Sequence, residues 1–350
     1  MEGLRHRLDR IAQAAGLDLL GIAGADPFPI VYDELRNRQT NGRASGLGFT
    51  YVDPEVATTP RASFPWARSL VVGARSYLPR AGSPTTGDDQ GRVARVAVDD
   101  AYEPLREGLG AVAAALQDEG YRAEVLCDDS RLVDRAAAVR AGLGWWGKNT
   151  MVLTPGFGPW LLFGSVVTDA RLDPDRPMGR DCGSCEACLP ACPTGALVAP
   201  GILDARRCLA AWAQAPGSIP VEYRVAMDDR LYGCDDCIEA CPPGHRLLKR
   251  SSQPRGTVDL GWVLWASDST LLERFGHWFL PDRKASIIRR NALIAAGNSG
   301  DRSLVRSTAA YAKHPDPVLA EHAVWALARL GGFAANAVLQ TAGRDSPSGK

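Results

Sequence analysis

Two short runs of cysteines constrain this chain more than any other feature of its sequence. The first, CGSCEACLPACP, covers residues 182–193, and the second, CDDCIEACP, covers residues 234–242. Both end in Cys-x2-Cys-x3-Cys-Pro, and eight of the nine cysteines lie between Asp173 and about Arg250 among short segments rich in Pro and Gly. A stretch of this kind, without long hydrophobic periodicity, predicts a module that bound metal holds together.

The cysteines also match the ligand count of two [4Fe–4S] clusters. In two-cluster bacterial ferredoxins, each run gives three cysteines to one cluster, and its last cysteine, before proline, to the other. The second run lacks a leading cysteine because Leu231 stands in its place, and the lone Cys208 is the only cysteine left nearby. The rule predicts one ligand set of Cys182, Cys185, Cys188 and Cys241, and a second set of Cys192, Cys208, Cys234 and Cys237.

Two zinc sites, each with four cysteines, are the alternative. Zinc ribbons use paired Cys-x2-Cys knuckles rather than triplets followed by Cys-Pro, so the pattern favours iron–sulfur clusters. The proline has a physical role as well, because it ends the local turn, removes a backbone donor and steers its cysteine away from its own run. Two neighbouring clusters transfer one electron at a time, and they imply an acceptor that the cysteines do not supply.

Composition indicates an ordinary globular protein. The chain has 350 residues, 45% of them hydrophobic and 23% charged, which predicts two or three domains with normal cores. Its formal net charge is zero, so contact with nucleic acid requires a local basic patch. No apolar stretch approaches the roughly 20 residues that span a bilayer. The N-terminal segment MEGLRHRLDRIAQAAG has no apolar signal core, so we expect a cytoplasmic protein in which disulfides are rare.

The first third of the chain alternates helix and strand patterns, which predicts an α/β domain. Helices are expected over Leu4–Ala15, Pro104–Glu119 and Arg131–Arg140, and strands over 17–24, 69–79, 123–127, 144–153 and 160–170. From Asp259 onward the pattern is helical. Segments 283–298 and 316–331 share a motif about 30 residues apart, which predicts HEAT-like helical pairs, with a plain helical bundle as the alternative.

Two local motifs allow more than one interpretation. Gly142-x-Gly144-x-x-Gly147 has the spacing of a dinucleotide-binding fingerprint, but that fingerprint follows a strand and precedes a helix. Here the order is reversed, so a tight helix-to-strand turn is the better interpretation. Asp128 and Asp129 follow a strand candidate and precede a helix, and either could cap that helix. The adjacent Cys127 could be an ordinary buried thiol.

Taken together, the cysteine runs, AGLGWWGKNT (141–150), DARRC (204–208), RLYGCDDC (230–237) and EHAVWALARLG (321–331) resemble the epoxyqueuosine reductase family, in the same order along nearly the whole chain. The resemblance implies an N-terminal α/β cobalamin-binding domain over 1–172, a ferredoxin-like module with two [4Fe–4S] clusters over 173–250, and a C-terminal α-helical HEAT-like domain over 259–343. It also implies reduction of epoxyqueuosine to queuosine at the wobble position of tRNA anticodons, with electrons passing through the clusters to cobalt.

The resemblance assigns roles to individual residues. The family's proton-donating aspartate falls on Asp128, ahead of the acidic-Arg pair Asp134-Arg135. A protonated carboxyl there would supply the proton that epoxide opening requires, worth roughly 10²–10⁴ in rate, provided that burial against the corrin raises its pKa. The cobalamin contacts that the resemblance implies are Asp128, Gly144, Lys148, Asn149, Cys234 and Asp235.

The chain departs from the family pattern in several pocket segments. Ala57 stands where the family has arginine, and the family's Asp-Tyr-His reads Ala101-Tyr102-Glu103. The segment after Cys208 reads AAWAQA, and the Cys-Pro-Trp-Asn ending reads Cys241-Pro242-Pro243-Gly244. These departures keep open a corrinoid iron–sulfur reductase of another, small-molecule electrophile. A non-catalytic electron carrier is a third hypothesis, although the α/β third is far larger than a carrier needs.

Basic pairs follow the cluster module at Lys249-Arg250, Arg283-Lys284 and Arg289-Arg290. Phosphate contacts supply most of the affinity for tRNA and need such a patch. A solvated helix face, balanced by nearby acids, is the alternative, and the resemblance favours binding of the tRNA anticodon region. We also expect an external one-electron donor, no membrane association and a monomer.

Overall fold

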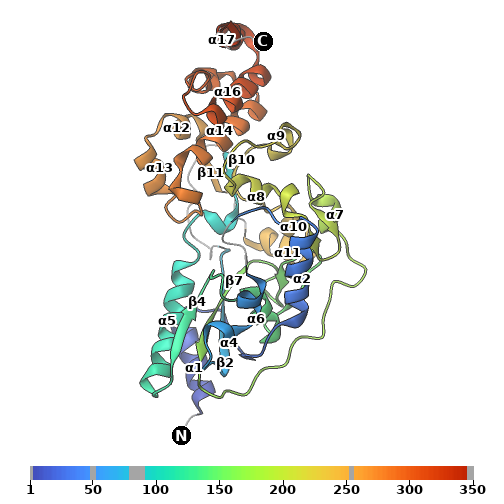
Figure 1. Cartoon of the computed structure of the whole chain (residues 1–350), viewed down its shortest axis with the longest axis vertical. Helices are drawn as coiled ribbons and strands as arrows, with labels where there is room; N and C mark the ends of the chain where they lie inside the picture. The colour runs from blue at the N-terminus through green and yellow to red at the C-terminus, as the bar shows by residue number, and fades with distance from the viewer. Residues whose placement is uncertain (1–2, 48–52, 79–90, 252–255, 345–350) are drawn as a thin grey trace. The chain divides into compact units, whose positions relative to one another are not determined.

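The computed structural model describes residues 3–47, 53–78, 91–251 and 256–344 (Figure 1). The chain divides into two compact units, and each unit combines segments that are far apart in the sequence. Unit 1 contains Met1–Gly82, Asp100–Ala205 and Asp236–Ser252, and unit 2 contains Ser83–Asp99, Arg206–Asp235 and Gln253–Lys350. The division into three domains at the predicted boundaries stays a prediction. No helix in the described ranges is long and apolar enough to cross a membrane.

A four-stranded sheet forms the centre of unit 1, with the strand order β1-β2-β7-β4. Its strands are β1 Leu19–Gly24, β2 Ser69–Ser76, β7 Leu161–Thr168 and β4 Ala123–Leu126, which confirms four of the expected strands. Every pairing in this sheet is antiparallel. The mixed helix-and-strand character is therefore confirmed, whereas the parallel sheet of a strict α/β domain is absent from these four strands. A sequence pattern fixes the type of each element and not the direction in which strands pair.

Helices cover both faces of this sheet. On one face, α1 Leu4–Ala14 and α5 Glu103–Asp118 pack through Leu8 and Leu109 against strand residues such as Val71. The opposite face is covered by α6 Asp134–Arg140 together with α2 Pro29–Thr40, α3 Pro54–Thr58 and α4 Pro60–Ser63. Figure 1 shows α5 and α6 on opposite sides of β4 and β7. Burial of these apolar faces holds the loop after β4 between two packed layers.

The glycine motif after α6 forms the predicted turn. Gly142 has a φ of +70°, its N–H donates to the Val139 carbonyl at 3.1 Å, and the Leu143 N–H donates to the Ala138 carbonyl at 3.0 Å. This pair of bonds is the Schellman motif that ends many helices. The single strand expected over 144–153 is wrong, because the segment folds back as a hairpin of β5 Trp145–Trp146 and β6 Val152–Leu153.

The parts of the cysteine runs that belong to unit 1 lie on or next to short elements. These are α7 Cys188–Ala191, the hairpin of β8 Leu197–Ala199 and β9 Ile202–Leu203, α10 Asp236–Glu239 and α11 Pro242–Ser251. Helices α7 and α10 pack against each other although about 50 residues separate them in the sequence. The packing brings the first cysteine run close to the second.

Unit 2 is mainly helical and is built around α14. Its helices are α8 Leu209–Gln214, α9 Val221–Met227, α12 Leu260–Trp265, α13 Asp268–Arg274, α14 Ala285–Ser299, α15 Val305–Ala309, α16 Pro317–Leu330 and α17 Gly332–Arg344, with 3-10 turns at Arg95–Ala97, Pro281–Arg283 and Arg302–Leu304, and another at Ala205–Arg207. A small sheet joins β10 Arg230–Tyr232, β3 Gly91–Val93 and β11 Gly256–Val258. Helices α14 and α16 confirm the two expected helices and pack against each other, while their HEAT-like pairing stays a prediction.

The turn at Gly142 provides a stability test with a matched control. A Cβ atom at Gly142 would lie 2.4 Å from the Arg176 carbonyl oxygen, whereas one at Gly120, which ends α5 with a φ of +85°, would meet nothing within 4 Å. Left-handed strain costs each alanine variant about 1–2 kcal/mol. We therefore expect Gly142→Ala to lower the urea midpoint clearly more than Gly120→Ala, and equal midpoints would contradict the close approach of Arg176.

Candidate functional site

Four of the predicted iron ligands lie together in unit 1. Burial, together with the nearby thiols of Cys182, Cys188 and Cys185, raises the pKa of Cys241 to about 11. Burial and the thiols of Cys182 and Cys185 raise the pKa of Cys188. These mutual effects require short distances through space, so the structure brings the first predicted ligand set together. Their role as ligands of one cluster stays a prediction.

The hairpin that follows α6 supports the first cysteine run. The Lys148 ammonium donates to the Gly183 carbonyl at 2.9 Å and lies 3.4 Å from a carboxylate oxygen of Glu186. Its positive charge lowers the pKa of Cys188, against the stronger effect of burial. A cation beside several thiols favours their ionised form, which is the form that binds iron. Lys148 therefore has a defined place next to the cysteine run, and its predicted contact with cobalamin stays a prediction.

The same hairpin also contacts the second cysteine run. Asn149 is buried, its side-chain N–H group lies 3.4 Å from the Cys237 carbonyl, and its Oδ1 accepts the Met151 N–H at 3.2 Å. Packing also requires a glycine at position 144, because a Cβ atom at Gly144 would lie 2.5 Å from the Leu153 carbonyl oxygen. Both residues thus have structural roles within unit 1, in addition to the cofactor contacts predicted for them.

Cys192 lies in a turn that donates hydrogen bonds to its sulfur. The Ala196 N–H donates to Sγ at 3.1 Å. Burial raises the pKa of this thiol, but donation from the backbone N–H groups of Leu197, Thr194 and Ala196 outweighs burial, so the net pKa is lowered. A turn that stabilises a thiolate suits a metal ligand.

The four cysteines of the second predicted set are divided between the two units. Cys192 and Cys237 belong to unit 1, whereas Cys208, the N-cap residue of α8, and Cys234, just after β10, belong to unit 2. Asp235, beside Cys234, accepts the Arg95 N–H at 2.8 Å and pairs with its guanidinium at 3.6 Å. The second ligand set, and the cofactor contacts of Cys234 and Asp235, stay predictions. Across the described ranges, no group of three or more His, Cys, Asp or Glu side chains has the spacing of a single-metal site.

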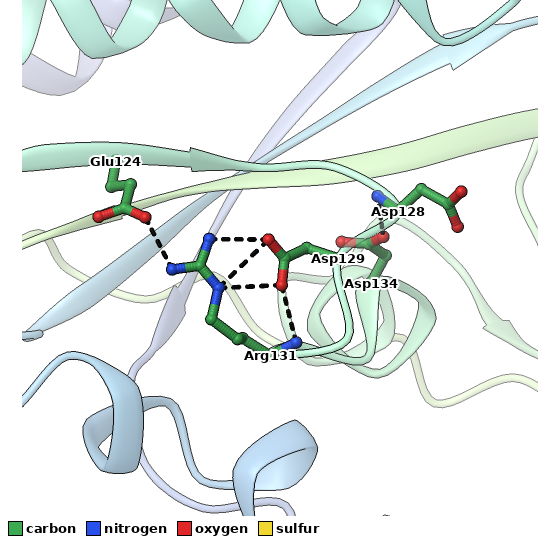
Figure 2. A network of polar contacts seen from close by, with 5 residues as sticks. All are labelled: Glu124, Asp128, Asp129, Arg131 and Asp134. Atoms are coloured by element: carbon green, nitrogen blue, oxygen red, sulfur yellow. Dashed lines mark hydrogen bonds and ion pairs between the residues drawn. The ribbon is translucent and has the colours of Figure 1, made fainter. Parts of the chain in front are cut away.

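Asp128 lies in the loop after β4 with its carboxyl turned outward. Its φ is +55°, and its N–H donates to Oδ2 of Asp134 at 3.0 Å. Figure 2 shows the Asp128 carboxyl pointing away from both Asp134 and Asp129. Although the residue is exposed, the protein atoms around the carboxyl desolvate it enough to raise its pKa, against the opposing charges of Arg106 and Arg135. The prediction that Asp128 or Asp129 caps the next helix is wrong, because α6 begins at Asp134 and has no side-chain cap.

Asp129 has the opposite electrostatic environment. Its carboxylate accepts the Arg131 N–H at 2.8 Å and the Arg131 guanidinium at 2.7 Å, and this guanidinium also reaches Glu124 at 2.9 Å (Figure 2). Hydrogen bonds from Arg131 hold the pKa of Asp129 below its usual range. Two adjacent carboxyls thus have pKa values moved in opposite directions, which is how proteins separate an acid from a permanent anion.

Burial raises the pKa of three further groups around Asp128. Burial raises the pKa of Asp134 well above its usual value, and its Oδ1 is buried without a hydrogen-bond partner among the described residues. Burial also raises the pKa of Tyr102, and that of Cys127 to about 12. Sequence reasoning recognised Asp134 only as part of the acidic-Arg pair, and it missed that this carboxyl holds the Asp128 backbone. The half-buried Cys127 packs against the core of unit 1, close to the ordinary buried thiol that was one expectation.

Comparison with known proteins agrees with this geometry. Residues 181–244 match the family described as a 4Fe-4S double cluster binding domain. The epoxyqueuosine reductase of Bacillus subtilis (strain 168) is 35% identical over 341 residues, which cover 94% of this chain and 88% of the relative. The chain belongs to the epoxyqueuosine reductase family. As a member of that family it is an oxidoreductase.

Solved structures of family members have the same fold over nearly the whole chain. A crystal structure of an epoxyqueuosine reductase with an epoxyqueuosine-modified tRNA-Tyr stem loop has a TM-score of 0.89 and 33% identity, and the match covers 99% of this chain and 95% of that one. The epoxyqueuosine reductase of Streptococcus thermophilus has a TM-score of 0.82 and 26% identity, with 97% and 98% covered. This chain therefore shares the fold of these epoxyqueuosine reductases.

The prediction that the basic pair Arg289-Arg290 contacts tRNA phosphates is wrong. Arg289 and Arg290 are 7% and 1% exposed, so neither can reach a phosphate on the surface. A helical pattern does not show which face of α14 is buried when both faces are covered. Arg283, Lys284 and Lys249 are exposed, and Lys284 pairs with Asp282 at 3.0 Å. The side chain of Arg250 lies outside the described residues.

The thiols of unit 1 provide a direct test of the first ligand set in this reductase. Cys241→Ala removes one ligand of a four-iron cluster, so we expect the anaerobically reconstituted protein to lose about four iron atoms per chain. Cys127→Ala is the matched control, because that thiol packs against the core and belongs to neither ligand set. Iron and acid-labile sulfide assays measure the difference. Full iron content in Cys241→Ala would contradict the first ligand set.

Proposed function

We propose that this chain reduces epoxyqueuosine in tRNA to queuosine, with two [4Fe–4S] clusters delivering electrons to cobalamin and Asp128 donating a proton. The observation that carries the proposal is the Asp128 carboxyl, which points away from Asp134 and Asp129 and whose pKa is raised by burial, in a chain that also contains a double-cluster module. Family membership supports the substrate, because the relatives are named epoxyqueuosine reductase and one solved structure contains an epoxyqueuosine-modified tRNA stem loop.

The reaction balance explains why an acid is needed. Converting an epoxide to an alkene releases its oxygen as water, which takes two electrons and two protons. A carboxyl with a raised pKa keeps its proton closer to neutral pH, and it can deliver that proton as the oxygen becomes negative. Asp129 cannot take this role, since its pKa is lowered and Arg131 occupies its oxygens. Asp128 is therefore the proton donor in this proposal.

The residues fit the proposed cofactors in their donor chemistry. Eight cysteines supply eight thiolates for two four-iron clusters, and four of them already lie together. Cobalamin, when bound, supplies a cobalt centre that accepts single electrons and returns them to an electrophilic carbon. A large ring placed over the Asp128 carboxyl would remove further water from it and raise its pKa more. Nε1 of Trp145, next to Gly144, is buried without a partner among the described residues, and it could donate to a cofactor amide.

One departure from the family pattern has a structural cause in this chain. The Gly244 carbonyl accepts the Trp160 indole N–H at 3.1 Å, and a Cβ at Gly244 would lie 2.5 Å from the Ile238 carbonyl oxygen. The glycine of the Pro243-Gly244 ending is therefore explained by its close approach to Ile238, so this change does not require a new substrate.

The proposal includes the partners that the chemistry requires. The tRNA would bind through its anticodon region, and exposed cations such as Arg283 and Lys249 could contact its phosphates. An external one-electron donor would reduce the clusters, and we propose that the protein acts as a cytoplasmic monomer.

The direct test replaces the proposed acid. Asp128→Asn keeps the shape of the side chain and the backbone N–H bond to Asp134 but cannot donate a carboxylic proton. We expect the rate of queuosine formation to fall by roughly 10²–10⁴, with iron and corrinoid content unchanged. Single-turnover nucleoside analysis measures the rate, and full activity would remove Asp128 from the mechanism.

Asp129→Asn is the matched control, because it alters the neighbouring carboxyl. The negative charge of Asp129 raises the pKa of Asp128, so removing this charge lowers that pKa. The acid acts in its protonated form, and the rate therefore falls as pH rises through its pKa. We expect Asp129→Asn to stay active with this fall moved to lower pH. A shift to higher pH, or no shift, would contradict the assignment.

A further inference from the structure

Asn291 links two separate segments of unit 2 through a single amide group. The side chain is fully buried on α14, and its Nδ2 donates to the Ala213 carbonyl at 2.8 Å and to the Leu231 carbonyl at 2.9 Å. Ala213 belongs to α8 and Leu231 to β10, and both elements pack against α14 (Figure 1). The two hydrogens of one amide thus fix the spacing between α8 and β10.

Each of these segments carries one predicted iron ligand. Cys208 is the N-cap residue of α8, and its carbonyl accepts the Trp212 N–H at 3.0 Å. Cys234 lies three residues after Leu231 and packs against the apolar cluster that contains Leu209 and Ala213. The distance between α8 and β10 therefore determines where these two sulfurs can lie relative to each other.

Arg290 fixes the orientation of the Asn291 amide. Its Nε and Nη2 donate to Oδ1 of Asn291 at 3.1 and 2.8 Å, so the NH₂ group of Asn291 must face Ala213 and Leu231. The remaining guanidinium hydrogens bind carbonyls at the end of α8, at Trp212 (2.8 Å), Ala215 (2.5 Å) and Gly217 (2.7 Å). These carbonyls would otherwise lack partners where the helix ends.

The arrangement is costly in free energy. No carboxylate in the described part of the chain forms a salt bridge with Arg290, and burial lowers its pKa to about 9. A cation buried among carbonyls loses its hydration without the compensation of an opposite charge. Buried polar groups of this kind can fix one unique arrangement where an apolar side chain would allow several.

We propose that Asn291, oriented by Arg290, is a positioning residue for the second iron–sulfur cluster, because it sets the spacing of the segments that present Cys208 and Cys234. The inference rests on the proposed second ligand set and is independent of the substrate. The proposal also gives a role to Arg290, which is too deeply buried to bind a phosphate.

Arg289 supplies a control on the same helix. It is also buried, but its Nε donates to the Tyr311 hydroxyl at 2.9 Å, its Nη2 to the Ala266 carbonyl at 2.6 Å, and it pairs with Asp268. These contacts connect α14 to α13 and to the residues that follow α12 and α15, and none involves the segments that carry Cys208 or Cys234. A loss of general stability can thus be separated from a loss of ligand positioning.

The experiment compares Asn291→Asp with Arg289→Met in the full chain after anaerobic reconstitution. Aspartate still accepts from Arg290 but donates nothing to Ala213 and Leu231, so we expect iron per folded chain to fall by about half, with the spectroscopic signal of one cluster lost. Arg289→Met should lower the melting temperature and keep the full iron content. Arg290→Lys is a milder second variant. It keeps the positive charge but loses the paired hydrogen bonds that the guanidinium donates to Oδ1 of Asn291. We expect this variant to lose part of the same iron.

Full iron and both cluster signals in Asn291→Asp would overturn the proposal, as would an equal loss of iron in Arg289→Met. Cys208→Ala tests the ligand set itself. If that variant retains all its iron, the second set is wrong and the inference fails with it. If Cys208→Ala loses one cluster while Asn291→Asp loses none, the ligand set stands and only the positioning role is overturned.

Discussion

The packing that brings cysteines from distant segments close to one another is the constraint on which the rest of this structure depends. Cys182, Cys185 and Cys188 come from one run and Cys241 from another, and the packing of α7 against α10 brings the two runs close together. Lys148 and Asn149 hold these two runs from a single hairpin. That hairpin follows α6 through the Gly142 turn, and α6 follows the Asp128 loop. One short continuous stretch of chain therefore connects the proposed acid to the cysteine runs.

The chemistry at the other end of this stretch depends on where water is excluded. Asp128 and Asp129 are neighbours in the sequence, yet their carboxyls face different surroundings (Figure 2). Arg131 keeps Asp129 ionised, while desolvation favours the protonated form of Asp128. The backbone bond from Asp128 to Asp134 supports the left-handed conformation that turns the acid outward. Local geometry thus shifts the pKa values of two adjacent aspartates in opposite directions.

Much of this organisation could be predicted from the sequence, because cysteine spacing and helix periodicity are local signals. The spacing of the cysteines identified the double-cluster module, and the order of Gly142 and its flanking elements identified a turn. Non-local features were missed. The antiparallel pairing of the sheet, the hairpin at Trp145 and the burial of Arg289 and Arg290 depend on tertiary packing, which determines the face that a residue presents. The hydrogen bond from the Asp128 backbone N–H to the Asp134 carboxyl joins two residues that no periodicity connects.

The account is tested most directly by reconstituting the protein anaerobically with iron, sulfide and cobalamin, adding epoxyqueuosine-containing tRNA and a one-electron reductant, and analysing the nucleosides by mass. The account predicts a bound corrinoid, about eight iron atoms per chain and the appearance of queuosine. Bound corrinoid and iron without queuosine would contradict the proposed substrate. A protein that binds its iron but no corrinoid would contradict the proposed route of the electrons.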